Sequence, residues 1–487
     1  MRNEIRALKV AAKLADAVIA TAAGLCVTLT VYYVYVYGWT GAREFAHPIG
    51  VAFYYILPVL VASLLLASLK LNALQRIKLT LMLGSVAVPL YAIEAWLSLP
   101  SQRLRQRLET KIETAKKFGV DFDVRSKGQV LADLRDKGID AYPAIVPHLL
   151  LEPAPEGHFA SVIKIGEEEV LPLTGISNKV SVLCNETGIP VSYESDERGF
   201  QNPKGLWAAD RIDLVALGDS YVKGWCVPPH ESFVTSIRRD FPRTLNLGVT
   251  GHGPLMMLGT LKEYASRVKP RVVMWFYFDG NDLGDLKKER QSPLLMRYLD
   301  KDFLQRLYNR QPEIESALAH YLLGEMNRLR RSNFVEESAP PKNRIQELEG
   351  FIKLAETRTR LGLTGVLSRS NDVDQENEFE EVKHLLTRVL AEAKRTVDTW
   401  NGEIYFVYLT GFGGWKRDAE KEQVLKVARN LGFPIIDLHE AFDEHGDPFS
   451  LFPFRQPAHY NEIGHQYVAQ VVLKFLELDA NRNPPVS

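Results

Sequence analysis

The first hundred residues contain three long stretches that are almost free of charged side chains. Residues 17–42 and 45–69 carry no Asp, Glu, Lys or Arg, and residues 79–99 carry one, Glu94. Each stretch has about the 20 residues that an α-helix needs to cross a bilayer. Three transmembrane helices are therefore predicted, the third the weakest because Pro89 and Glu94 interrupt it. A cleaved signal peptide is the competing interpretation of the first stretch, but that stretch is too long and a second follows it directly.

Positively charged residues flank the first two stretches unequally. They lie before the first stretch and after the second at Arg2, Arg6, Lys9, Lys13, Lys70, Arg76 and Lys78. The loop between the two stretches has Arg43 alone. Because positive residues stay on the cytoplasmic side, the N-terminus is expected in the cytoplasm, and three crossings place the soluble part outside. If the third stretch did not cross, the soluble part would be cytoplasmic.

Charge and cysteine content narrow the classes of partner and cofactor. The formal net charge is −1, and the soluble part has no basic run, so no nucleic-acid partner is predicted. The three cysteines have neither the spacing of a zinc site nor the density of a disulfide scaffold, and no metal or cofactor is predicted. Cys26 lies in an apolar stretch, so only Cys184 and Cys226 could pair. Two free buried thiols are the alternative.

Composition and pattern divide the chain into four parts. Residues 1–100 are the predicted transmembrane region, and residues 101–119 alternate charged and apolar positions at helical spacing, which predicts a helical stalk. Residues 120–209 contain short β-like runs broken by Pro, Gly and Asn, and form a small accessory region. Residues 210–487 form the main domain, with a helical insertion at about 286–401 that is too long for a simple crossover.

The main domain has an α/β pattern. Five short apolar runs alternate with helical or irregular sequence, at residues 213–218, 244–249, 272–278, 403–409 and 434–438. This alternation favours a parallel sheet covered by helices on both faces. Reactive groups of such sheets collect at the carboxyl ends of the strands, so the residues after each run are the candidates for chemistry.

Ser220 directly follows the first run. It stands in Gly218-Asp219-Ser220-Tyr221, where the strand is expected to turn into a helix. A hydroxyl there is exposed beside free N–H groups that favour developing negative charge. Taken alone, a serine at this place is as well explained as the N-cap of the helix.

The second and third runs end in residues suited to hold an oxyanion. Gly251 lies in the glycine-rich segment 246–253, where backbone N–H groups can approach a ligand closely. Asn281 follows the third run within residues 279–282, and its amide can donate a further hydrogen bond. The alternatives are a glycine-rich turn and an Asx turn.

A histidine follows the last run. His459 lies in the loop that precedes the helical stretch 466–476, from which an imidazole could take the proton of Ser220. His465 is expected to belong to the start of the helix. Four separate signals thus fall at the ends of different elements of one sheet, which independent structural roles would rarely produce.

In this order of motifs the chain resembles the GDSL/SGNH hydrolase family, in its membrane-anchored bacterial form. The likeness covers about residues 210–287 and 402–476, and its blocks are Gly218-Asp219-Ser220, Gly251, Gly280-Asn281-Asp282 and His459. The segment from Tyr193 to Pro203 also resembles a lead-in of membrane-attached bacterial members, often encoded near extracellular polysaccharide genes.

The resemblance implies a fold and a set of roles. The fold would be a flavodoxin-like three-layer α/β/α domain. Ser220 would be the nucleophile and His459 its base. The backbone N–H groups of Ser220 and Gly251 and the side chain of Asn281 would form the oxyanion hole.

One departure from the family pattern concerns the acid that orients the histidine. The family places an aspartate two or three residues before the histidine, where this chain has Pro457 and Gln456. A backbone carbonyl or Gln456 could orient His459 in a dyad, with a rate loss of up to about 10⁴-fold, or the site could have decayed. A distant acid such as Asp437, Asp443 or Asp447 could also substitute.

The sequence therefore predicts a serine esterase or O-acyltransferase that acts on an acylated extracytoplasmic glycan or lipid through an acyl-serine intermediate. Hydrolase and transferase differ only in the acceptor, which the sequence does not specify. The expected location is the bacterial inner membrane, multi-pass, with the soluble domain in the periplasm. The sequence does not specify any protein partners.

Two other hypotheses stay open at this point. The missing acid favours a catalytically weak or inactive subunit that binds glycan or assists assembly in an envelope polysaccharide system. A transporter component ranks last, since Asp16 and Glu94 are the only acidic residues near the apolar stretches and offer little for an ion path.

Overall fold

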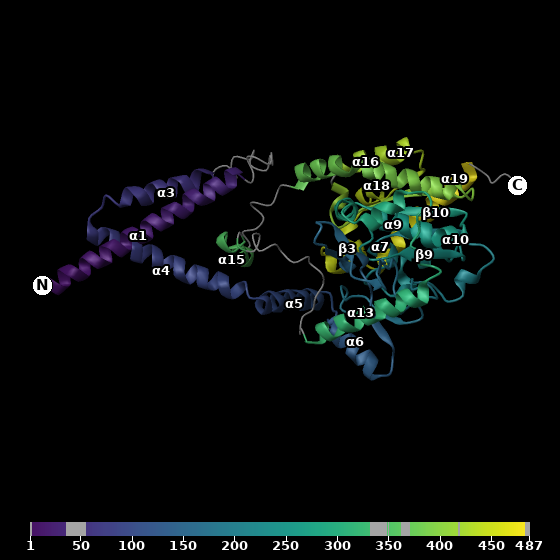
Figure 1. Cartoon of the computed structure of the whole chain (residues 1–487), viewed down its shortest axis with the longest axis horizontal. Helices are drawn as coiled ribbons and strands as arrows, with labels where there is room; N and C mark the ends of the chain where they lie inside the picture. The colour runs from purple at the N-terminus through teal and green to yellow at the C-terminus, as the bar shows by residue number, and fades with distance from the viewer. Residues whose placement is uncertain are drawn as a thin grey trace. The chain divides into compact units, whose positions relative to one another are not determined.

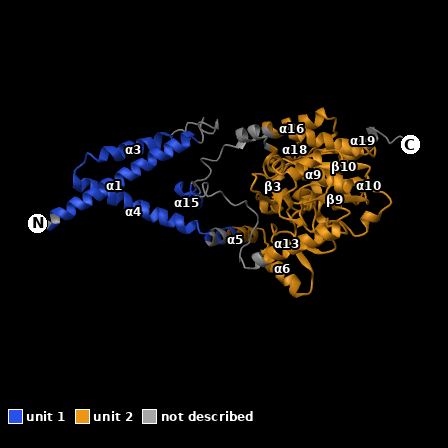
Figure 2. Cartoon of the chain, viewed as in Figure 1, with its two compact units in different colours: residues 1–107, 340–375 blue, residues 108–339, 376–487 orange. Residues whose placement is uncertain are grey.

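The computed structural model describes residues 2–35, 55–331, 348, 350–361, 371–416 and 419–482. The chain forms two compact units (Figure 2). The first comprises residues 1–107 and 340–375, and the second residues 108–339 and 376–487.

The first unit is helical in its described residues. Its helices are α1 (Arg2–Tyr33), α3 (Leu57–Ser68), α4 (Ala73–Leu97) and α15 (Ala355–Arg360). Two segments, Ile5–Tyr33 and Ala73–Leu97, are long and apolar enough to cross a membrane, and α3 is a shorter apolar helix. Of the predicted stretches, residues 36–42 and 45–54 lie outside the described residues.

The one acidic residue of the third apolar stretch is buried and bonded. The Glu94 carboxylate of α4 accepts hydrogen bonds from the backbone N–H groups of Glu356 and Thr357, at 3.0 and 2.8 Å, and from the Thr357 hydroxyl at 2.7 Å. These donors belong to the first turn of α15, where a helix favours negative charge. A segment from the predicted insertion thus compensates the charge that weakened the prediction of this helix.

The second unit begins within α5 (Pro100–Lys117), which agrees with the predicted stalk helix. The accessory region follows, with α6 (Lys127–Asp136) and seven short strands. These are β1 (Ala141–Pro143), β2 (Leu151–Pro153), β3 (Phe159–Ser161), β4 (Lys164–Ile165), β5 (Glu168–Glu169), β6 (Val180–Val182) and β7 (Ser192–Glu194). Strands β1, β6 and β7 form a three-stranded sheet, and the others pair in twos.

A five-stranded parallel sheet forms the centre of the unit (Figure 1). Its strands are β8 (Leu214–Gly218), β9 (Thr244–Gly248), β10 (Val272–Phe278), β11 (Glu403–Leu409) and β12 (Ile435–Asp437). They coincide with the five predicted runs. The spatial order is β12-β11-β10-β8-β9, so β8 lies between β9 and β10, and the order reverses beside it.

Alternate side chains of the strands enter two hydrophobic clusters, because successive residues of a strand point to opposite faces. Val215 and Leu217 of β8 lie in one cluster, with side chains of α9, α13, α16 and α17. Leu214 and Ala216 lie in the other, with side chains of α8, α18 and α19. Apolar residues of the accessory region, among them Leu171, join the first cluster. The sheet is thus buried on both faces, as a parallel sheet must be.

The remaining α-helices connect the strands, belong to the predicted insertion or follow the last strand. They are α7 (Ser220–Lys223), α8 (Phe233–Ile237), α9 (Pro254–Thr260), α10 (Ser266–Val268), α11 (Asp282–Glu289), α12 (Pro293–Met296), α13 (Gln311–Arg331), α16 (Asn371–Asp398), α17 (Ala419–Asn430), α18 (Leu438–Asp443) and α19 (Glu462–Arg482). Within the insertion, residues 332–347, 349 and 362–370 lie outside the described residues.

Candidate functional site

Ser220 begins helix α7 immediately after strand β8. The capping of this helix is done by its neighbour, because the Asp219 carboxylate accepts a hydrogen bond from the Tyr221 N–H at 2.9 Å. The Ser220 Oγ lies 2.9 Å from Nε2 of His459 and, more distantly, 3.4 Å from the second carboxylate oxygen of Asp219. Asp219, and not Ser220, therefore caps the helix. Ser220 and His459, which were singled out from the sequence, lie within hydrogen-bond distance of each other.

His459 lies in the loop that leads into α19, and its neighbours fix that loop. The Asn461 side chain donates a hydrogen bond to the carbonyl of Ser450 at 2.8 Å. The ring of Tyr221, which follows Ser220, is 4.8 Å from the imidazole and 4.6 Å from the buried ring of Tyr460. The aromatic packing thus holds the histidine against the helix that carries the serine.

The second ring nitrogen of His459, Nδ1, contacts a residue that the sequence did not indicate. Nδ1 of the imidazole lies 2.9 Å from one carboxylate oxygen of Glu186, and the backbone N–H of His459 donates to the other at 3.0 Å. Glu186 comes from the accessory region, in the hairpin loop between β6 and β7. Two hydrogen bonds to one carboxylate set both the position and the tilt of the imidazole.

The sequence left open which group orients His459, and the structure places a distant acid there, although not one of the named candidates Asp437, Asp443, Asp447 and Gln456. Asp437 caps α18 and pairs with Lys421, while Asp447 pairs with Arg455. Asp443 and Gln456 are exposed. The acid was missed because it precedes the sheet in the chain. The pair Cys184 and Cys226 was the signal that could have found it, since a bond between them brings Glu186 close to Ser220.

Contact with His459 favours the ionised form of Glu186. Burial acts to raise the pKa of Glu186, but the charge of His459, both hydrogen bonds from it and the charge of Lys111 outweigh burial, and the pKa is lowered. The carboxylate is therefore ionised at neutral pH. The site is not sealed, because the side chains of His459 and Glu186 are 24% and 15% exposed.

Gly251 follows β9, the strand on one side of β8. Its φ is +74°, and a Cβ there would collide with the imidazole of His148, so the turn requires glycine. The Gly251 carbonyl lies 3.3 Å from Nδ1 of His148 and can accept a hydrogen bond from it. His148 is the second residue of the accessory region to touch the site.

Asn281 follows β10, the strand on the other side of β8, and stands at the N-cap position of α11. Its side chain makes no capping hydrogen bond, and its Oδ1 has no hydrogen-bond partner among the described residues. The Asx-turn alternative is therefore not realised. Burial, together with the charge of Asp219, raises the pKa of the adjacent Asp282 well above its usual range, which keeps negative charge low there.

The segment Tyr193–Pro203 anchors the accessory region to the sheet. Buried Asp196 accepts hydrogen bonds from the Asn202 side chain at 2.8 Å and the Trp207 indole at 2.7 Å. The side-chain Oδ1 of Asn202 accepts from the Asn246 N–H of β9 at 2.7 Å, and the Asn246 side chain donates to the Val222 carbonyl of α7 at 2.8 Å. A continuous chain of buried polar groups thus runs from this segment to the helix of Ser220.

Lys223, the last residue of α7, is a buried cation. Its side chain is 3% exposed, and its ammonium lies 5.6 Å from the ring of Tyr193. Burial, with a smaller contribution from Lys127, lowers the pKa of Lys223 to about 7. Lys223 is therefore shielded from solvent between α7 and Tyr193 of the accessory region.

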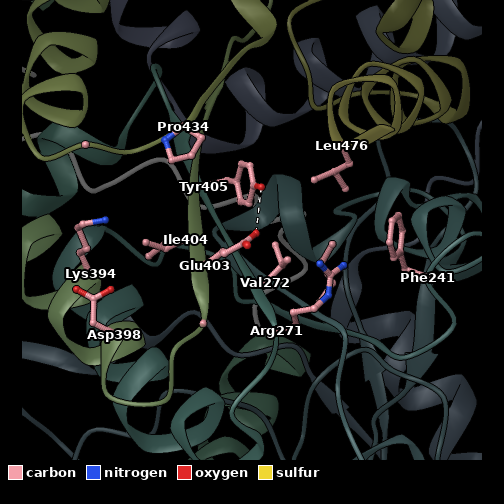
Figure 3. Close-up of a pocket in the computed structure, with 13 residues that line it drawn as sticks. Phe241, Arg271, Val272, Lys394, Asp398, Glu403, Ile404, Tyr405, Pro434 and Leu476 are labelled. Atoms are coloured by element: carbon pink, nitrogen blue, oxygen red, sulfur yellow. Dashed lines mark hydrogen bonds between the residues drawn. The ribbon is translucent and has the colours of Figure 1, made fainter. Parts of the chain in front are cut away.

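A cavity of about 480 Å³ lies at the amino-terminal ends of the strands (Figure 3). Leu214, Val272 and Glu403, the first residues of β8, β10 and β11, line it, and the Tyr405 hydroxyl donates to Glu403 at 3.2 Å. Ser220 follows the opposite end of β8, so this cavity is not part of the candidate site.

Over the described residues, no group of three His, Cys, Asp or Glu could hold a metal ion.

No family model matches the chain, and no curated protein matches it. Three solved structures are similar to it, each with a TM-score of 0.28. A two-domain esterase (CEX) active on acetylated mannans, co-crystallised with mannopentaose, shares 11% identity, and the match covers 56% of this chain and 50% of that one. This chain therefore spans half the length of that esterase.

The other two structures are matched over nearly their whole length. The lipase/acylhydrolase from Enterococcus faecalis shares 12% identity over 57% of this chain and 99% of that one. The enzyme LAE5, an alpha/beta hydrolase from the metagenome of Lake Arreo, Spain, shares 15% identity over 55% of this chain and 97% of that one. All three are hydrolytic enzymes.

Proposed function

We propose that the chain is a serine esterase or O-acyltransferase whose catalytic triad is Ser220, His459 and Glu186. The observation that supports this is the continuous series of contacts, 2.9 Å from Ser220 Oγ to His459 Nε2 and 2.9 Å from His459 Nδ1 to Glu186. A serine hydroxyl needs a base to become nucleophilic, and the base needs an anion that stabilises its protonated form.

The reaction follows from these contacts. Ser220 Oγ attacks the carbonyl carbon of an ester while His459 Nε2 takes the hydroxyl proton, and ionised Glu186 stabilises the imidazolium. The N–H groups of Ser220 and Gly251 and the amide of Asn281 hold the negative oxygen of the tetrahedral intermediate. His459 returns the proton to the leaving alcohol, which leaves an acyl-serine. Water or a sugar hydroxyl then takes the acyl group by the same steps in reverse.

We further propose that the sheet and its helices form the flavodoxin-like three-layer domain of the GDSL/SGNH family. The strand order β9-β8-β10-β11-β12, which is 2-1-3-4-5 along the chain, supports this. So does the position of Ser220, Gly251 and Asn281 after three neighbouring strands, where the strand order reverses. Ligands bind at that point in open sheets of this kind.

The proposed substrate is an acylated glycan or lipid outside the cytoplasm, and the proposed location is the bacterial inner membrane with the second unit in the periplasm. The two apolar segments Ile5–Tyr33 and Ala73–Leu97 support a membrane anchor. The disulfide between Cys184 and Cys226 supports an oxidising compartment, because such bonds persist there.

An inactive glycan-binding or assembly subunit was favoured only by the missing acid. Glu186 provides a carboxylate at the required place, so that ground no longer exists. The catalytic proposal is therefore the one to test.

The test uses the full-length protein in detergent, a fluorophosphonate probe and 4-nitrophenyl acetate, with and without a glycan acceptor. We expect the probe to label Ser220, and Ser220→Ala or His459→Ala to lower ester turnover by about 10⁴-fold or more. Acyl transfer to the glycan would identify a transferase, and release of acetate alone a hydrolase. Ser316→Ala and His320→Ala, both exposed on α13, are the matched controls. Unchanged labelling in either site variant would refute the triad.

A further inference from the structure

We infer that the disulfide Cys184–Cys226 is the positioning device for the triad acid, so that the cleavage of one S–S bond releases Glu186 from His459. The inference rests on the proposed function and extends it to the control of the same site. Cys184 and Cys226 are positioning residues, because they act on the reaction only through Glu186.

Glu186 occupies a place in the fold that needs such a restraint. It lies in the loop between β6 and β7, strands of three residues each, whose pairing continues to Cys184 and Val191 but stops before Glu186. A loop of this kind opens more easily than the end of a buried strand. Ser220, by contrast, follows a fully buried strand of the central sheet.

The disulfide restrains the loop of Glu186 on one side. It joins Cys184, two residues before Glu186, to Cys226, six residues after Ser220, with a Cα–Cα distance of 5.4 Å. Both cysteines are buried in one apolar cluster with Tyr193 and Trp225. The Trp225 ring is 6.2 Å from the imidazole of His459. The covalent bond thus connects the acid loop directly to the segment that follows the nucleophile.

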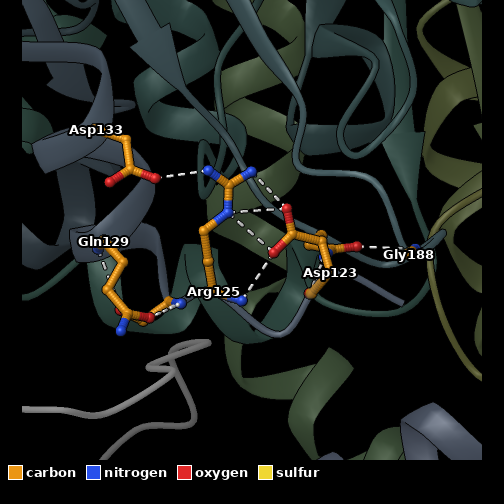
Figure 4. Close-up of polar contacts among 7 residues, drawn as sticks. Asp123, Arg125, Gln129, Asp133 and Gly188 are labelled. Carbon is orange, nitrogen blue, oxygen red and sulfur yellow. Dashed lines mark hydrogen bonds and ion pairs between the residues drawn. The ribbon is translucent and has the colours of Figure 1, made fainter. Parts of the chain in front are cut away.

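Hydrogen bonds hold the other side of the loop (Figure 4). The Asp123 N–H donates to the Gly188 carbonyl at 2.9 Å, and the Asn185 side chain donates to the Asp123 carbonyl at 2.8 Å. Arg125 pairs with the Asp123 carboxylate at 2.6 Å, which lowers the pKa of Asp123. Gly188 has a φ of +96°, where Val120 leaves no room for a Cβ.

The two restraints differ in strength. Arg125 is 46% exposed, so its ion pairs are screened by solvent and contribute little on their own. The disulfide is covalent and shielded, with Cys184 and Cys226 at 7% and 1% exposure. Misplacement of a catalytic group by about 1 Å can cost about 100-fold in rate. The disulfide is therefore the restraint whose loss matters most for Glu186.

The redox step is a simple exchange. A dithiol such as dithiothreitol breaks the bond between Cys184 and Cys226 and supplies two electrons and two protons, which gives two thiols, and the reductant closes its own disulfide. No atom of Ser220 or His459 changes. The nucleophile and base stay in place while their acid is freed.

The experiment measures turnover of 4-nitrophenyl acetate by the full-length protein in detergent, before and after dithiothreitol. Alkylation and mass analysis confirm the two new thiols. We expect kcat to fall by about 100-fold or more, towards the level of the Glu186→Gln variant, with little change in KM. Reduction of Glu186→Gln protein should cause no further loss, because the acid is already absent. Reoxidation should restore wild-type turnover.

A second readout does not depend on activity. The His459 N–H donates to Glu186, so hydrogen exchange of a peptide that contains it should become faster on reduction. The variant Cys184→Ala with Cys226→Ala should behave like reduced protein without reductant. If that variant does not fold, reduced wild-type protein provides the same comparison. Cys26→Ser, which leaves the disulfide intact, is the control and should keep the full response to reductant.

Three results would overturn the inference. The first is complete reduction with unchanged turnover and unchanged exchange at His459. The second is an equal loss of activity in the Glu186→Gln background, which would mean that the bond acts through another group. The third is loss of activity with global unfolding, seen by circular dichroism. If oxidised wild-type protein hydrolyses no ester, the proposed function fails, while exchange at His459 still decides whether the bond holds Glu186.

Discussion

The central sheet and the accessory region both supply groups to the candidate site, but they fix them by different means. The sheet has parallel strands of up to seven residues, buried on both faces, and β8, β9 and β10 end directly before the segments of Ser220, Gly251 and Asn281. The accessory region has strands of two or three residues. Of its contributions, Glu186 lies in a loop that a disulfide and a few hydrogen bonds hold, and His148 lies in the short 3₁₀-helix Pro147–Leu150.

The two regions therefore hold their functional groups in place in different ways. A group that follows a buried strand is placed by the whole core, so it moves only if the core moves. A group in a short hairpin is placed by contacts that can be broken one at a time. Changes in the accessory region should therefore alter catalysis more than stability. The variants below test that division, from the largest expected effect to the smallest.

The largest effect is expected for Glu186→Gln. This change keeps the size of the side chain but removes the charge that stabilises protonated His459, and kcat should fall by about 10⁴-fold. Steady-state ester kinetics measure it, with the exposed Glu194→Gln as the control. A loss of less than about tenfold would mean that the accessory region supplies no acid, and the comparison between the two regions would break.

The Glu186→Gln variant should also change how the stability of the protein depends on pH. The pKa of Glu186 is lowered in the folded protein, so its contribution is fully present above the ordinary value near 4.5 and is lost as the pH falls through the folded value. Chemical denaturation at pH 6 and pH 3 should show a smaller drop for Glu186→Gln than for the wild type. The amount of this difference measures how tightly the loop holds its acid.

A smaller effect on rate is expected for Asn281→Ala, on the sheet side. Removal of one oxyanion donor should lower kcat by about 10²- to 10³-fold, with little change in KM. Because the Asn281 side chain makes no capping hydrogen bond, the melting temperature should stay close to that of the wild type. Asn309→Ala, at an exposed position, is the control. A large fall in melting temperature without loss of kcat would assign Asn281 to the fold instead.

The smallest effect is expected for Lys223→Met, because Lys223 lies where α7 meets the accessory region. Its pKa of about 7 in the folded protein lies below the ordinary value of 10.5, so the unfolded chain binds more protons between these pH values. Stability of the wild type should therefore rise with pH across that window. Lys223→Met should lack the rise, and exposed Lys204→Met should keep it. Parallel curves for Lys223→Met and wild type would mean that water reaches the boundary.

Much of the sheet side was predictable because its signals are local. Each strand is a compact apolar run, and Ser220, Gly251 and Asn281 each follow such a run by a few residues. The pairing of Ser220 with His459 followed from the order of the runs, since the ends of neighbouring parallel strands meet at one edge. No property of distant residues was needed for any of these predictions.

The acid was not predictable in the same way. Glu186 stands in Cys184-Asn185-Glu186-Thr187-Gly188, which has no strand, no helix and no periodicity around it. Its role exists only through the fold of the accessory region against His459. The start of α1 at Arg2, well before the predicted apolar stretch, has a simpler reason: the charged residues there are good helix formers, although they are poor membrane residues.

The position of Glu186 before the first strand of the sheet decides where this protein can be divided. A fragment that starts at residue 210 would encode every recognisable motif and all five parallel strands, yet its imidazole would have no anion behind it. Exchange of residues 120–209 between two such chains would replace the electrostatic partner of the base while the nucleophile stayed the same. The accessory region is thus the natural unit for tuning the strength of the base.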